Sequence, residues 1–161
     1  ETSSKITNEL LFTGFMTDYR SSIISQLKES SFTLACPQKF VSRKNRDTMN
    51  RSAKLVLNIP QRKDWRWLSL MRVVAALRCG RATVSLGTKD NSQIAACCHQ
   101  LDISDQRWLD EIKGSVNNWT SLYKTAYDNY MLMAENFERS RGFPHDMFEF
   151  WAITDHLAKK I

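Results

Sequence analysis

The chain lacks the features that identify membrane proteins and disulfide-stabilised proteins. Its apolar runs, such as Val73–Leu77, are far shorter than the roughly 20 residues of a membrane-spanning helix. The cysteines are too few and too irregularly spaced for a disulfide framework: Cys36, Cys79, Cys97 and Cys98. We therefore expect no membrane contact and a reducing, intracellular location, either cytoplasmic or in the nucleoid or nucleus.

Motifs that would identify an enzyme are also absent. The sequence contains no Walker loop, G-x-G-x-x-G, G-x-S-x-G or H-E-x-x-H. Cys97-Cys98-His99 lacks a second ligand pair at the spacing that zinc sites use. A set of Cys98, His99 and Asp102 is too close in sequence for a catalytic triad, whose members the fold normally brings together. We expect a protein that is not an enzyme and needs no cofactor, no metal and no small-molecule substrate.

What the chain does have is a concentration of positive charge. Residues 36–81 contain 12 of the 23 lysines and arginines but only two of the 17 acids, Asp47 and Asp64. This basic segment carries a net charge of +10 within a chain whose total is +6, so the remainder is slightly acidic. Clustered charge raises the local electrostatic potential and attracts polyanions, of which nucleic acid is the leading candidate.

The nucleic-acid-binding residues that we expect lie in three parts of this segment. They are Arg43, Lys44, Arg46 and Arg51 in an exposed arm, Lys54 on a strand, and Arg62, Lys63, Arg66 and Arg72 around a helix. Cations at this density would neutralise several phosphates and release their counterions. Two alternatives remain: the charges dock an acidic protein partner, or they only solvate the surface.

The pattern of apolar residues predicts an α+β protein that is predominantly helical. Three short strands are expected near 32–36, 54–59 and 82–86, and a basic loop at 37–52. Helices are expected at 5–29, 62–78 (ended by Gly80), 91–101, 104–141 and 146–160. The last two would form a long C-terminal helical hairpin (104–161) packing on a mixed basic region (1–103), together one folded unit.

The segment from strand 54–59 through Pro60 and the following helix to Gly80-Arg81 loosely resembles the opening of a ribbon-helix-helix DNA-binding domain. The resemblance covers about 30 residues and implies a strand that enters the major groove as part of a dimer. The chain departs from the family at Ala82–Asn91, where Gly87 and β-branched residues occupy the place of the second helix.

Trp65-Arg66-Trp67 could provide aromatic rings for stacking on single-stranded bases. On the helix predicted here, the two tryptophans would point about 200° apart, so at most one could face a basic surface. We therefore expect both to pack in the core.

Self-association is expected through the long helix that begins at Ser104. A helix of about 35 residues is roughly 50 Å long, more than a domain of this size can cover. Its uncovered half would leave an apolar patch that soluble proteins seldom tolerate. The homodimer interface predicted here consists of Trp108, Ile112, Val116 and Trp119.

Together these patterns favour a non-enzymatic nucleic-acid-binding protein, with DNA favoured over RNA and duplex DNA as the expected partner. The context that we expect is a regulator or accessory factor of a mobile element or virus. The alternative function is a protein-interaction module whose basic face docks an acidic partner.

Overall fold

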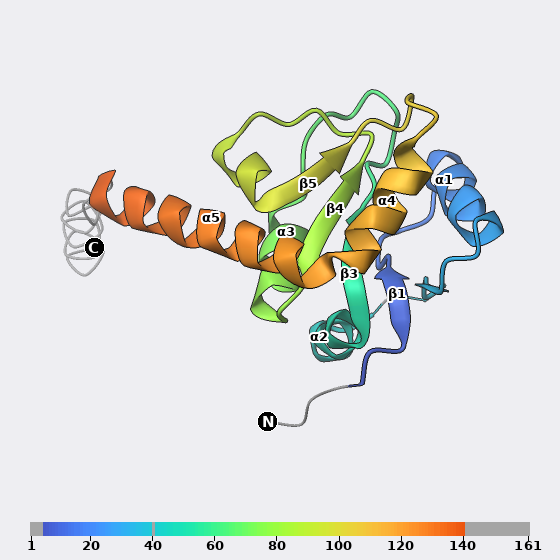
Figure 1. Ribbon diagram of the computed structural model, residues 1–161, viewed down its shortest axis with the longest axis horizontal. Coiled ribbons are helices and arrows are strands. Elements are labelled where there is room, and N and C mark those ends of the chain that lie inside the picture. Colours follow the sequence, from blue (N-terminus) through green and yellow to red (C-terminus); the bar gives the residue numbers. More distant parts are fainter. Residues whose placement is uncertain (1–4, 40, 141–161) are drawn as a thin grey trace, which may run out of the picture. The chain divides into compact units, whose positions relative to one another are not determined.

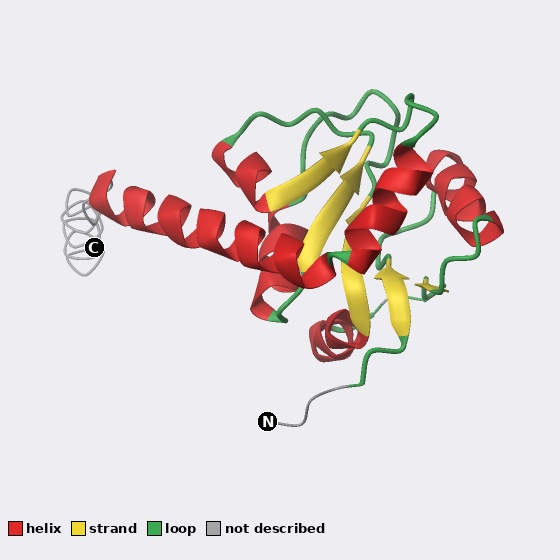
Figure 2. Ribbon diagram, in the orientation of Figure 1, coloured by secondary structure: helices red, strands yellow, loops and turns green. Residues whose placement is uncertain are grey.

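A computed structural model describes residues 5–39 and 41–140. Its centre is a five-stranded sheet in the order β2-β1-β3-β4-β5, in which all neighbouring strands are parallel (Figures 1 and 2). The strands are β1 (Asn8–Leu11), β2 (Leu34–Ala35), β3 (Ala53–Asn58), β4 (Ala82–Leu86) and β5 (Cys98–Leu101).

Helices connect the strands and cover both faces of the sheet. They are α1 (Asp18–Glu29), α2 (Arg43–Ser52), α3 (Leu70–Arg78), the 3-10 turn η1 (Gln93–Cys97), α4 (Trp108–Asn117) and α5 (Trp119–Ser140). Right-handed crossovers place α1 on one face, and α2 and α3 on the other, because the chain reverses direction across the sheet after β2. Figure 1 shows α4 in front of the strands and α3 behind them.

The core follows from the apolar character of the central strands. Five of the six residues of β3 are buried, and so are all five of β4. Such strands are apolar on both sides because helices cover both faces of a parallel sheet. On one face, the buried apolar residues are Ile23, Ile24 and Leu27 of α1 and Trp108, Ile112 and Val116 of α4.

The expected mixture of helix and strand, with helix predominating, is confirmed among the described residues. The three expected strands are present in whole or in part, but β1 and β5 were missed. Residues 8–11 were assigned to a helix because Ile6 and Leu10 fit helical spacing. A strand of four residues that is buried at Leu10 and Leu11 shows no alternation to contradict that assignment.

Two further elements differ from expectation within the basic segment. Most of the predicted loop 37–52 is the helix α2, whose ten residues are so polar that no apolar periodicity reveals it. The helix expected from Arg62 begins only at Leu70, after an irregular loop. Its end is as predicted: Gly80 has a φ of 75°, and Arg81 N–H donates to the carbonyl of Ala76.

The resemblance to a ribbon-helix-helix domain does not extend to the fold. Strand 54–59 corresponds to β3, which pairs in parallel with β1 on one side and β4 on the other. Both of its edges are therefore occupied within one chain, and it cannot form the intersubunit ribbon that the resemblance implies.

The long helix expected from Ser104 is divided at Asn118 into α4 and α5. The chain separates into two compact units, of which the first ends at Tyr130 and the second begins at Met131. The expected helix 146–160 lies outside the described residues. None of the helices in the described part combines the length and the apolar character that crossing a bilayer requires.

Candidate anion-binding site

The order of the strands creates a crevice at the carboxyl edge of the sheet. Strands β1 and β3 are neighbours, but the loops that follow them lead to helices on opposite faces. In open parallel sheets, ligands bind outside the carboxyl ends of the strands at such a switch point. Here the surroundings are the loop after β1, the loop after β3, and the N-terminal turns of α2 and α3.

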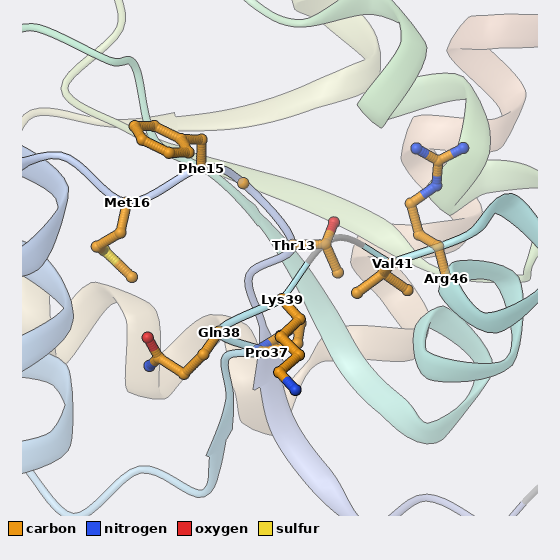
Figure 3. A pocket seen from close by; sticks show the side chains of 9 residues that line it. Thr13, Phe15, Met16, Pro37, Gln38, Lys39, Val41 and Arg46 are labelled. Atoms are coloured by element: carbon orange, nitrogen blue, oxygen red, sulfur yellow. The ribbon is translucent and has the colours of Figure 1, made fainter.

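Two adjoining hollows lie at this edge. The larger, of about 260 Å³, is lined by Thr13 and Gly14 of the loop after β1, by residues preceding α2, and by Arg46 of α2 (Figure 3). The smaller, of about 90 Å³, shares Thr13 and Arg46 and adds Asn50, Ser69 and Arg72. Arg46 and Thr13 therefore border both hollows.

Arg72 is a largely buried cation on the first turn of α3. Its Nη1 donates a 2.8 Å hydrogen bond to Oδ1 of Asn58, and its guanidinium lies 5.4 Å from the centre of the Phe12 ring. Burial, together with the positive charges of Arg20 and Arg46, lowers the pKa of Arg72 to about 10. Arg20 lies against the same Phe12 ring, and Arg46 borders the smaller hollow together with Arg72, so the three arginines lie near one another.

Arg20, on α1, fixes the two loops at the switch point. Its Nη1 donates to the carbonyl of Phe15 at 2.7 Å, and its Nε and Nη2 donate to the carbonyl of Ile59 at 2.9 and 2.6 Å. Its guanidinium lies 5.3 Å from the centre of the Phe12 ring. Burial lowers the pKa of Arg20. This arginine is occupied by backbone carbonyls, so its role is to position the loops.

Within the described chain, Arg46 has a hydrogen-bond donor that is free to bind a ligand. Its Nε is buried without a hydrogen-bond partner among the described residues. The ion pairs of the described chain involve Lys54, Arg62, Lys89 and Arg107, so none neutralises Arg20, Arg46 or Arg72. The first turns of α2 and α3 also contain no acid, although an acid there would favour the helix dipole. The crevice therefore carries uncompensated positive charge.

A buried chain of polar groups extends from Arg72 across the carboxyl edge. Asn58 Nδ2 donates to Ser85 Oγ at 2.8 Å, and Ser85 Oγ lies 2.7 Å from the hydroxyl of Thr88. That hydroxyl is 2.9 Å from Oε1 of Gln100. Because Asn58 is held by Ser85, its carbonyl oxygen is directed at Arg72, which fixes the guanidinium beside the crevice.

The nine basic residues predicted from the sequence fall into four places. Arg46 and Arg72 border the crevice, and Arg43 and Lys44 are exposed on the first turn of α2. Arg62, Lys63 and Arg66 are exposed on the loop after β3. Arg51 and Lys54 lie at the opposite edge, where α2 ends and β3 begins, and Lys54 pairs with Glu9.

Sequence reasoning missed the residues that shape the crevice around the basic ones. Thr13 and Gly14 were assigned to the interior of a helix, and Arg20 was an isolated base within it. The useful signal was Leu10-Leu11-Phe12 followed at once by Thr13-Gly14, a buried strand ending in a small polar turn.

Other kinds of site find no support within the described residues. No three His, Cys, Asp or Glu side chains gather as a set of metal ligands there. Burial, together with the neighbouring Cys97 and Asp90, raises the pKa of Cys98 to about 12, so this thiol is not activated as a nucleophile. No protein-family model matches the chain, and no curated protein matches it.

Proposed function

We propose that this protein binds the phosphate groups of a nucleotide-containing ligand in the crevice between β1 and β3. The observation that carries the proposal is that Arg46 and Arg72 border one hollow with no carboxylate to neutralise them in the described chain. Arginine is suited to this task because its planar guanidinium forms paired hydrogen bonds with phosphate oxygens.

The electrostatics of the free protein also support a bound anion. The positive charges of Arg20 and Arg46 destabilise the charged form of Arg72 and, with burial, lower its pKa. A phosphate between Arg46 and Arg72 would relieve that repulsion and give the buried Nε of Arg46 an acceptor. Two helix N-termini that lack acids would add backbone N–H groups and favourable dipoles.

Calorimetric titration with inorganic phosphate and with ADP tests this proposal. We expect both to bind, and we expect Arg46→Gln and Arg72→Gln each to weaken binding by about 10- to 100-fold, the value of one charge-assisted hydrogen bond. Lys113→Gln removes the same charge from an exposed position on α4 and serves as the matched control. The absence of binding by the unchanged protein, or equal losses for all three variants, would refute the proposal.

A second candidate is binding of nucleic acid, with DNA favoured over RNA. A specific observation favours it: three arginines, Arg43, Arg46 and Arg78, and a single acid, Asp47, line a groove between α2 and α3 that adjoins the crevice. Exposed Lys44 adds to this surface. The cations on these two helices are more numerous than a single phosphate group can contact. Such an extended set suits the successive phosphates of a nucleic-acid backbone.

The nucleic-acid candidate retains the expected non-enzymatic role as a regulator or accessory factor of a mobile element or virus. For short DNA, the logarithm of the binding constant should fall linearly with the logarithm of the salt concentration. The magnitude of the slope should be on the order of 3 to 5 if a few phosphates are neutralised. Binding to an acidic protein while all nucleic acids fail to bind at low salt would favour the alternative of a protein-interaction module.

A further inference from the structure

The loop between β3 and α3 holds two tryptophans out in the solvent. The side chains of Trp65 and Trp67 are 47% and 61% exposed, and neither lies on a helix. The expectation that both pack in the core is therefore wrong. The objection to a stacking role was that a helix would point the two tryptophans about 200° apart. Because neither tryptophan lies on a helix, that objection no longer applies.

The backbone on both sides of the exposed Trp67 is fixed by hydrogen bonds. The carbonyl of Arg66 accepts a 3.2 Å hydrogen bond from Lys89 N–H, and the N–H of Leu68 donates a 2.8 Å hydrogen bond to Oδ2 of Asp90. The residues on both sides of Trp67 are thus tied to the segment after β4. A fixed backbone that presents an exposed aromatic ring is organised for binding before the ligand arrives.

Asp90, which accepts the hydrogen bond from this loop, is itself held in place by several hydrogen bonds. Asp90 accepts hydrogen bonds from the N–H and hydroxyl of Ser92, while its own backbone groups pair with the side chain of Gln100. Burial opposes ionisation of Asp90, but the hydrogen bonds from Leu68 and Ser92 keep the pKa of its carboxyl below the ordinary value. The carboxylate is committed to the loop and adds little free negative charge beside the tryptophans.

Positive charge accompanies the two rings. Arg62, Lys63 and Arg66 are all exposed on the same loop, and the guanidinium of Arg62 lies 5.9 Å from the centre of the Trp65 ring. Asp64 is the loop's own acid, and its 3.5 Å contact with Arg62 is between largely exposed groups, so it is weak. Aromatic faces interleaved with cations are the arrangement that binds unpaired bases and their phosphates.

The other tryptophans in the described chain provide an internal contrast. Trp108 is only 5% exposed, and Trp119 is half-buried beneath Arg81, whose guanidinium lies 4.8 Å from its ring centre. That guanidinium is held by the carbonyls of Ala53, Gly80 and Arg51, so the pair is part of the framework. Trp65 and Trp67 have no comparable burial.

We infer that Trp65 and Trp67 form a stacking surface for the unpaired bases of single-stranded nucleic acid. This inference rests on the nucleic-acid form of the proposed function: the arginines of the crevice and the α2–α3 groove hold phosphates while the loop after β3 holds bases. In a duplex the bases already stack on one another, so the surface selects single strands. A polymer fits better than a free nucleotide because the cations extend over α2, α3 and this loop.

The test compares a fluorescently labelled single strand of about 15 nucleotides with a duplex of the same length and salt. The single strand should bind more tightly and quench tryptophan fluorescence. Trp67→Leu should weaken its binding by about 5- to 100-fold, the range for loss of one stacked base, and should leave duplex binding unchanged. Trp67→Phe should retain most of the affinity, because phenylalanine still offers a ring.

Two controls separate failure of this inference from failure of the proposed function. Melting temperature and circular dichroism should be the same for both Trp67 variants as for the unchanged protein, since the side chain is mostly exposed. Phosphate binding should be weakened in Arg72→Gln and unchanged in Trp67→Leu. A single strand that binds equally well to Trp67→Leu overturns the stacking surface while the phosphate site stands.

Binding of vesicles containing anionic lipid is the competing outcome, because exposed Leu70 and Met71 follow the loop. Vesicle binding that depends on Trp67, with no preference for single strands, would overturn the inference in favour of a lipid surface.

Discussion

Phe12 shows how one residue organises the charge of the crevice. Its fully buried ring contacts the guanidinium groups of both Arg20 and Arg72. The face of an aromatic ring carries partial negative charge, so it offsets part of the cost of holding two buried cations near each other. It does so without the formal charge of a carboxylate, which would compete with an incoming phosphate.

Gly14 is expected to be indispensable to this arrangement. A Cβ at Gly14 would come within 2.9 Å of Cε2 of Phe12 and closer still to its Cζ, so Gly14→Ala must displace the ring. We expect a loss of about 1 to 3 kcal/mol in the free energy of unfolding, the usual cost of overpacking, together with weaker phosphate binding.

The matched control is Gly114→Ala on α4. Nothing lies within 4 Å of a Cβ at Gly114, so this change should raise stability by up to about 1 kcal/mol through helix propensity. Urea unfolding and phosphate titration measure both variants. Equal effects of the two changes would mean that the ring does not organise the site.

Asp90 gives the fold a contribution to stability that depends on pH. Because hydrogen bonds hold its folded pKa below the unfolded value, its contribution is present above about pH 4 and lost as pH falls through the folded pKa. Asp90→Asn should therefore be less stable than the unchanged protein at pH 7 by about 1 to 3 kcal/mol, and the gap should narrow at acid pH.

Urea unfolding at several pH values measures that gap, and amide hydrogen exchange at Leu68 reports the release of the loop. A gap that stays constant from pH 7 to pH 3 would mean that the charge of Asp90 does not hold the loop.

At the scale of elements, the sequence predicted the strands that have a clear apolar run. It missed elements that are too short or too polar to show an apolar pattern. Strands β3 and β4 were found because their apolar runs are bounded by Pro60 and Gly87. The two missed strands, β1 and β5, have only four residues each, too few for a periodicity. Without β1 beside β3, the switch point could not be recognised, although its two arginines were already among the predicted residues.

The positions of the positive charges on α2 do not favour the stability of the helix, but they would favour binding of an anion. Arg43 and Lys44 occupy its first turn, where the helix dipole disfavours cations. Lys44→Glu should therefore stabilise the free protein by about 0.3 to 1 kcal/mol while weakening phosphate and DNA binding.

Thermal unfolding and titration of the same preparation test this trade-off. Lys113→Glu, in the middle of α4, makes the same charge change away from the crevice and should alter neither property strongly. If Lys44→Glu left affinity intact, the charges of the first turn would have no part in binding.

At the scale of the whole molecule, burial changes the basis for expecting a dimer. The exposed fractions of Trp108, Ile112 and Val116 are 5%, 0% and 1%, so these side chains of α4 are already covered within one chain. Trp119 is half-buried against Arg81. Self-association stays a prediction, but the apolar patch that motivated it is not left open at these positions.

Ile112→Ala distinguishes an interface residue from a core residue. Because Ile112 is fully buried, we expect its truncation to cost about 2 to 5 kcal/mol of unfolding free energy and to leave the sedimenting mass of the folded protein unchanged. Urea unfolding and sedimentation equilibrium at micromolar concentration measure these two quantities. An interface residue would behave in the opposite way, because its truncation would lower the mass of an assembled species while a separated chain kept its stability. A two-fold dimer that survives Ile112→Ala must be held by other surfaces, and its two basic faces would still suit a symmetric nucleic-acid site.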